Sequence, residues 1–157
     1  MKRKITAMPF SDSAVEYFMK GYNCAQAVYA AFAPALGISA EEALRLSSPF
    51  GGGFGRMREV CGAFSGMMLV VGHIFGYDTI GSAEQGELYP RVQQLGERFR
   101  QRFGTLICRE LLKGKAQVGG IASDRTPEYY KDRPCARFVE GAAEILEEYL
   151  KEEGVLA

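Results

Sequence analysis

The sequence predicts an all-α fold, a single-domain bundle of six or seven helices around a buried, uncharged central helix. Apolar residues recur at intervals of three and four along most of the chain, whereas the alternating runs typical of strands are scarce. One segment without formal charge, residues 60–76, lies near the middle of the chain. A length of 157 residues suits one domain, and no linker or internal repeat divides it, so we expect residues 1–157 to form one unit.

Capping residues predict the first three helices, because their side chains can accept a hydrogen bond from the first helical turn. The expected helices cover residues 11–20, 24–35 and 39–46. The expected caps are Ser13 with Glu16, Asn23, and Ser39 with Glu42. Pro34 has no backbone N–H group to donate, so we expect it to end the second helix early.

Residues 47–58 are rich in glycine and are expected to form an extended loop, because the glycines and Pro49 oppose a helix. The glycines are Gly51, Gly52, Gly53 and Gly55. Their successive backbone N–H groups, followed by Arg56 and Arg58, could form a nest that binds an anion. Alternatively, the segment is a close-packed turn that positions Cys61. The pattern of a nucleotide-binding P-loop or Rossmann fingerprint is not present.

The central helix is expected over residues 60–76, which are apolar on every side, so other helices should enclose it. The segment approaches the length of a membrane span. However, glycines, Ser65 and His73 dilute its apolarity, and we therefore expect no insertion into a membrane. We interpret His73 as a hydrogen-bonded core residue, because on a straight helix it lies too far from Cys61 to share a metal ion.

The second half of the chain is expected to contain three more helices and a long irregular segment, residues 114–131. The helices are expected over residues 88–103, 106–113 and 132–153. Pro90 suits the first turn of the first of these helices, and Thr105 can cap the second. An irregular segment of this length is typical of a lid or a binding loop.

Composition limits the partners and the compartment. Lys and Arg together number 19, as do Asp and Glu, so no net charge draws the chain to nucleic acid or to an acidic membrane surface. The N-terminal residues lack the continuous apolar segment of a secretory signal, and four cysteines are too few for a disulfide-dense secreted scaffold. We therefore expect a cytoplasmic protein, in which ordinary thiols stay reduced.

The four cysteines share a position, since each falls in the first turn of an expected helix. They are Cys24, Cys61, Cys108 and Cys135. Unpaired N–H groups and the helix dipole favour an anion there, which lowers the pKa of a thiol. We expect the four sulfur atoms to cluster at the N-terminal end of the central helix. No two cysteines are closer than 27 residues in sequence, which excludes a local zinc knuckle or a C-x-x-C redox motif.

Five short motifs are spread over most of the chain. They are NCAQAV (23–28), FGGGFGR (50–56), CGAFSG (61–66), CREL (108–111), and RPC (133–135) with AAEIL (142–146). Together they resemble the C-GCAxxG-C-C family of redox-active proteins, described by one cysteine, a CGAxxG motif and two further cysteines. The family's four cysteines correspond to Cys24, Cys61, Cys108 and Cys135 in this sequence. The resemblance implies a small bacterial or archaeal protein with a redox role, and it names no substrate.

Three functions stay open. The first is a thiol oxidoreductase or electron-transfer protein whose four cysteines react with a redox partner protein or a small thiol or disulfide. The second is a module in which the same four cysteines bind zinc or an iron–sulfur cluster. The third is a non-catalytic helical interaction protein, and assembly of identical subunits is compatible with all three. For the first two functions, Cys61 is expected to have the lowered pKa and to be the attacking or cluster-anchoring sulfur.

Overall fold

The computed structural model describes residues 9–157 and shows an all-α bundle, as the sequence predicts. Six helices have eight residues or more: α1 (Phe10–Met19), α2 (Cys24–Leu36), α3 (Ala40–Ser47), α5 (Gly62–Phe75), α6 (Ala83–Phe103) and α9 (Cys135–Glu152). Shorter segments are η1 (Ser48–Phe50), α4 (Gly51–Phe54), α7 (Cys108–Leu111) and α8 (Pro127–Asp132). The N-terminal segment on which the expected cytoplasmic localisation rests includes residues 1–8, which lie outside the described residues.

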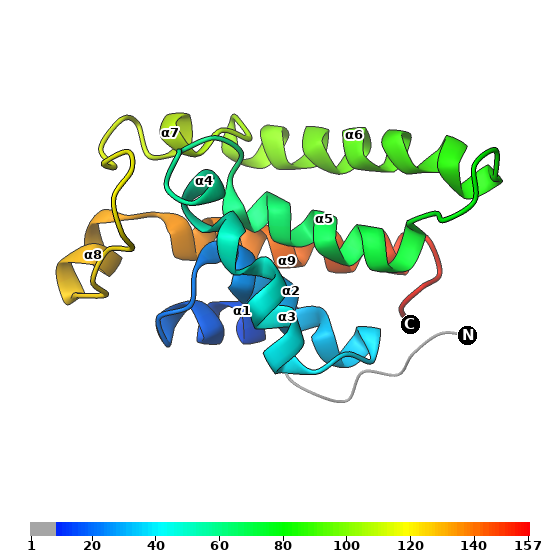
Figure 1. Cartoon of the computed structure of the whole chain (residues 1–157), viewed down its shortest axis with the longest axis horizontal. Coiled ribbons are helices and arrows are strands. Elements are labelled where there is room, and N and C mark those ends of the chain that lie inside the picture. The colour runs from blue at the N-terminus through cyan, green and yellow to red at the C-terminus, as the bar shows by residue number, and fades with distance from the viewer. Residues whose placement is uncertain (1–8) are drawn as a thin grey trace.

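Helix α5 lies in the middle of the bundle, with α6 running beside it and α9 on its other side (Figure 1). Its closest neighbour is α2, because glycines on α5 let the two backbones approach. A Cβ atom added to Gly66 would lie 2.8 Å from the carbonyl oxygen of Ala25. Gly62 also faces Ala25, at 3.2 Å from its backbone nitrogen. Small residues therefore set the spacing between these two helices.

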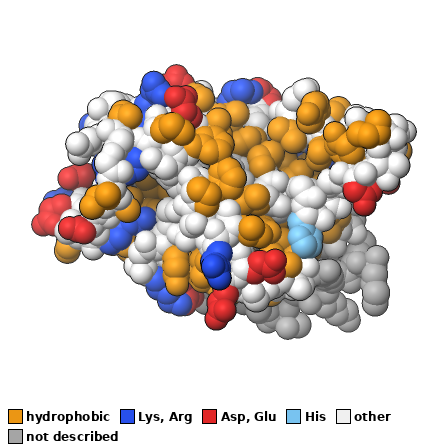
Figure 2. All heavy atoms as spheres, in the orientation of Figure 1, with side chains coloured by type: hydrophobic (Ala, Val, Ile, Leu, Met, Phe, Trp, Pro, Cys, Tyr) orange, Lys and Arg blue, Asp and Glu red, His pale blue; other side chains and the backbone are white. Residues whose placement is uncertain are grey.

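The expectation that other helices enclose α5 is correct for most of the helix but not for its C-terminal end, since Val70 and Val71 are still buried. Residues 62–67 are all buried, whereas Gly72 and His73 near the C-terminal end are exposed. The interpretation of His73 as a core residue is therefore wrong, and Figure 2 shows the histidine side chain on the surface. Neighbouring helices cover only part of α5 at this end. Among the helices of the described chain, none combines the length and apolarity that a membrane span requires.

Two predicted caps are confirmed. Asn23 and Gln26 form a reciprocal capping box at the start of α2, and the Ser39 hydroxyl accepts a hydrogen bond from the backbone of Glu42. The box predicted at Ser13 is wrong, because α1 already begins at Phe10. The expectation for Pro34 is also wrong, since α2 continues to Leu36 and ends at a left-handed glycine, Gly37.

Helix α6 begins earlier than the sequence predicts. The Ser82 hydroxyl accepts a hydrogen bond from the backbone N–H of Gln85, so the helix starts at Ala83 and Pro90 lies inside it. The Thr105 hydroxyl accepts from the backbone N–H of Ile107 and donates to the Glu110 carboxylate, but it does not cap α7, which is a single turn from Cys108. Figure 1 shows α4, α7 and α8 together at the end of the molecule where α9 begins.

Candidate functional site

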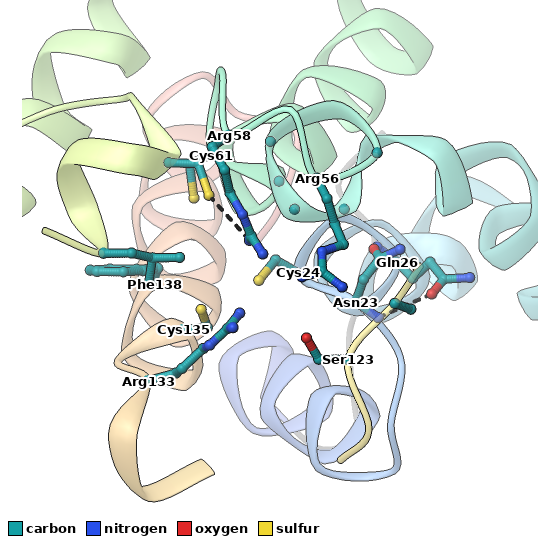
Figure 3. Close-up of a pocket in the computed structure, with 18 of the residues that line it drawn as sticks. Asn23, Cys24, Gln26, Arg56, Arg58, Cys61, Ser123, Arg133, Cys135 and Phe138 are labelled. Carbon is teal, nitrogen blue, oxygen red and sulfur yellow. Dashed lines mark hydrogen bonds between the residues drawn. The ribbon is translucent and has the colours of Figure 1, made fainter. Parts of the chain in front are cut away.

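All four cysteine side chains line one cavity of about 330 Å³. Cys24, Cys108 and Cys135 are the first residues of α2, α7 and α9, and Cys61 directly precedes α5. All four are free thiols, three of them buried and Cys24 partly buried. Figure 3 shows Cys24, Cys61 and Cys135 around the same space. The predicted clustering at the N-terminal end of the central helix is therefore confirmed.

The glycine-rich segment is a compact left-handed turn, and the expectation of an extended loop is wrong. Five successive residues have positive φ: Gly52 (67°), Gly53 (67°), Phe54 (63°), Gly55 (56°) and Arg56 (68°). Only glycine adopts this region without strain, so three glycines in five residues allow the turn. A Cβ atom on Gly53 would lie 2.8 Å from the Cβ of Cys108. The turn therefore packs directly against the thiol cluster.

A short backbone pairing holds Cys61 and Cys108 at the cavity. The N–H of Cys61 donates to the carbonyl of Leu106 at 2.7 Å, and the N–H of Cys108 donates to the carbonyl of Glu59 at 2.6 Å. These bonds flank the Val60–Ile107 bridge, which is the one β-type pairing within residues 9–157. Two cysteines 47 positions apart in sequence are thus brought to the same wall.

The irregular segment before α8 borders the cavity, with Gly120, Ala122, Ser123 and Arg125 in its lining. Hydrogen bonds attach it to the rest of the molecule. The N–H of Gly119 donates to the carbonyl of Arg56 at 2.9 Å, and the guanidinium of Arg125 donates to the carbonyl of Tyr22 at 3.0 Å. The segment is shorter than predicted, because Thr126 caps α8 through the N–H of Tyr129.

Four arginines line the cavity, and the described lining contains neither Asp nor Glu. They are Arg56, Arg58, Arg125 and Arg133. Arg58 is only 3% exposed; it donates to the carbonyl of Gln117 at 3.0 Å and to the sulfur of Cys108 at 3.8 Å. Sequence reasoning missed Arg125 and Arg133. The position of Arg133 two residues before Cys135 indicates that it lies near the site, whereas Arg125 lies in an irregular segment without a recognisable motif.

The acidity of Cys135 is increased by its neighbours. The Cys24 thiol donates a hydrogen bond to the Cys135 sulfur, and the charges of Arg133, Arg125 and Arg58 also favour the thiolate, so the pKa of Cys135 is lowered despite burial. The same hydrogen bond and burial raise the pKa of Cys24 well above its ordinary value. Of this pair, Cys135 therefore loses its proton more readily, and Cys24 retains its proton.

The expectation that Cys61 has a lowered pKa is wrong. Burial raises the pKa of Cys61 to about 12, although the backbone N–H groups of Ala63 and Phe64 oppose this shift. The helix N-terminus acts as predicted, but loss of hydration outweighs it. Burial likewise raises the pKa of Cys108, against the opposing effect of Arg58.

The residues proposed as an anion nest all line the cavity: Gly51, Gly52, Gly53, Gly55 and Arg56. Close packing limits substitution at Gly51, where an added Cβ would overlap the Asn23 side chain. Within the part of the chain that the structure describes, no three His, Cys, Asp or Glu side chains are grouped so as to hold a metal ion.

The comparison with protein families agrees with the motifs. Residues 22–149 match the family described as "Putative redox-active protein (C-GCAxxG-C-C)", and this range includes all four cysteines and the whole cavity except Gly21. No curated protein and no solved structure matches the chain. The match covers most of the sequence, and the chain therefore belongs to the C-GCAxxG-C-C family of redox-active proteins.

Proposed function

We propose that the protein is a dithiol–disulfide oxidoreductase whose redox pair is Cys24 and Cys135. The observation that carries the proposal is that both thiols lie at the same cavity, beside arginines that favour the thiolate of Cys135. The thiolate is the nucleophile in disulfide exchange, and a neighbouring thiol can resolve the mixed disulfide. The family description supports the redox assignment.

The Cys135 thiolate attacks one sulfur of a substrate disulfide, R–S–S–R′. A bond forms between Cys135 and the R–S group, and R′–S⁻ leaves. The Cys24 thiol gives its proton to this leaving group, and its sulfur then attacks the Cys135 sulfur, which forms the Cys24–Cys135 disulfide and releases R–S⁻. Two electrons pass to the substrate. A second dithiol, from a partner protein or a small molecule, reduces the pair again by the reverse exchange.

Cys61 and Cys108 stand outside this pair. Because burial raises the pKa of Cys61 to about 12, its sulfur stays protonated near neutral pH and does not attack. The Cys108 sulfur accepts the Arg58 hydrogen bond and lies against the glycine turn. We assign the redox step to Cys24 and Cys135 alone.

The test is to identify the first disulfide that forms. Reduced protein is treated with one equivalent of hydroxyethyl disulfide, blocked with N-ethylmaleimide and digested with trypsin. Lys or Arg lies between every two successive cysteines, so each cysteine leaves in its own peptide for mass spectrometry. We expect a Cys24–Cys135 linkage in the wild type and in Cys61→Ser. In Cys24→Ser, we expect a trapped mixed disulfide on Cys135. A first linkage between Cys61 and Cys108 would contradict the proposal.

A further inference from the structure

We propose that the cavity recognises negatively charged groups, so that the preferred substrates are small disulfides that carry carboxylates. The inference rests on the proposed dithiol function for its redox step and adds the substrate class. The residues that line the cavity do not balance its positive charges. Four guanidinium groups line the cavity without a described carboxylate, and none of the four forms an ion pair within residues 9–157.

Unpaired donors point to a missing acceptor. The Nε atom of Arg56 and the Nη1 atom of Arg125 are buried without a hydrogen-bond partner among the described residues. Buried guanidinium nitrogens are normally paired, because an unmade hydrogen bond away from water is costly. These two residues come from the glycine turn and from the irregular segment, so they approach the cavity on different segments. An anion bound between them would supply the acceptors.

Arg58 strengthens this inference because it is 97% buried, with a carbonyl and a thiol as its acceptors. Charged side chains are rarely buried to this extent without an opposite charge. The Cys135 thiolate can offset one of the four positive charges. The others remain for a ligand.

Two of the four arginines, Arg125 and Arg133, are held by stacking against aromatic rings. Arg125 stacks over Phe18 and Tyr129, at 4.7 and 4.6 Å from the ring centroids, and Arg133 lies 4.6 Å from the Tyr129 ring. Stacking occupies the face of a guanidinium group and leaves its edge for carboxylate oxygens. Figure 3 shows Arg133 and Arg58 entering the cavity from different sides.

Backbone dipoles add to the positive field. Helices α2, α5 and α9 all begin at the cavity, and the partial positive charge of a helix lies at its N-terminus. The volume of about 330 Å³ is that of a small-molecule site. Since the thiol pair and the arginines line the same cavity, the substrate that fits both is a small disulfide with carboxylate groups.

The experiment compares three small disulfides that differ in charge: dithiodipropionate with two carboxylates, neutral hydroxyethyl disulfide, and cystamine with two ammonium groups. Reduced protein reacts with each, and each rate is divided by the rate of free mercaptoethanol with the same disulfide. This division removes intrinsic differences in reactivity. We expect the normalised rate for the dianion to exceed that for the dication by about tenfold or more.

Arg56→Met is the test variant, because Arg56 carries one of the unpaired nitrogens. We expect it to lower the dianion-to-dication ratio by about threefold or more. The ratio cancels any general change in thiolate population or folding. Arg137→Met is the matched control, since Arg137 is exposed on α9 outside the cavity lining, and we expect it to keep the wild-type ratio.

The outcomes separate the two proposals. Equal normalised rates for the three disulfides in the wild type would overturn anion recognition and leave the dithiol function intact. Failure of the wild type to react with any of them would overturn the dithiol function and this inference with it. Since the comparison in the wild type needs no variant, poor folding of Arg56→Met would leave the inference testable.

Discussion

The four thiols are chemically alike in sequence, and their surroundings make them different. Cys61 has two backbone N–H groups directed at its sulfur, yet burial raises its pKa to about 12. Cys135 is also buried, but the Cys24 thiol and three arginines lower its pKa. The neighbouring thiol and the neighbouring charges therefore separate the acidities of these two sulfurs, which position in the first helical turn alone does not.

The order of alkylation tests this difference. We expect iodoacetamide at mildly acidic pH to label Cys135 before the other cysteines, because the lowered pKa gives it the largest thiolate fraction. Cys61 should be labelled last. The measurement is the extent of labelling against pH in reduced, chelator-treated protein, read from the four tryptic peptides by mass spectrometry.

Urea-unfolded protein is the control, because all four thiols should then react at similar rates near the ordinary thiol pKa. Labelling of folded Cys135 only at higher pH than in the unfolded control would contradict the assignment of the nucleophile. Preferential labelling of Cys61 would restore the expectation drawn from the sequence alone.

The residues of the site were predictable to different degrees. The cysteines and the glycines of the turn are visible as motifs, and the helix starts at Asn23 and Pro134 place two of the thiols. Arg125 could not be predicted, because its contact with Tyr22 joins residues 103 positions apart through an irregular segment. The pKa order of the thiols depends on burial and on such distant charges, so the sequence pattern does not contain it.

At the scale of elements, the contact between α2 and α5 positions two of the thiols. Cys24 begins α2 and Cys61 precedes α5, so the spacing of these helices fixes the separation of their N-termini. Gly66 permits this spacing, because an added Cβ would lie 2.8 Å from the Ala25 carbonyl oxygen and 3.0 Å from the Cβ of Val28.

We therefore expect Gly66→Ala to lower the free energy of unfolding by about 1–3 kcal/mol, since the two backbones must separate. Gly72→Ala is the matched control on the same helix, where the added Cβ meets nothing within 4 Å. Replacing this exposed glycine should raise the free energy of unfolding by about 0.5–1 kcal/mol. Urea unfolding of both variants measures the difference. Equal effects would show that close approach at Gly66 is unimportant.

Capping residues predicted elements better than breakers did. Asn23 and Ser39 marked helix starts correctly, because a cap acts on backbone groups within three residues. Ser82 with Gln85 carries a similar capping signal for the start of α6, whereas Pro90, which indicates a later start, lies inside the helix. The glycines of residues 51–55 indicate a backbone with wide conformational freedom, but they do not indicate that it forms a left-handed turn. The left-handed turn packs against Asn23 and Cys108, which are distant from it in sequence.

At the scale of the whole molecule, the buried thiols make stability depend on pH. The pKa values of Cys24, Cys61 and Cys108 are raised in the folded state, so this state keeps protons that the unfolded chain loses. Their ionisation therefore favours unfolding as the pH rises above the ordinary thiol pKa. Cys135 acts in the opposite sense: its contribution is complete above that value and is lost as the pH falls through its lowered pKa.

Cys61 gives this dependence a measurable slope. Between the ordinary thiol value of 9.0 and about 12, the unfolded chain is ionised at this residue and the folded chain is not. The free energy of unfolding should therefore fall by about 1.4 kcal/mol per pH unit in this window because of this one group.

Urea unfolding from pH 7 to about 11 measures the fall, with Cys61→Ala as the comparison. Lysines and tyrosines titrate in both proteins, so they cancel in the difference. We expect Cys61→Ala to be less stable at neutral pH, because it loses buried volume, and to close this gap with the wild type above pH 9. A constant gap across the range would show that Cys61 ionises as easily in the folded protein as in the unfolded chain, which its burial opposes.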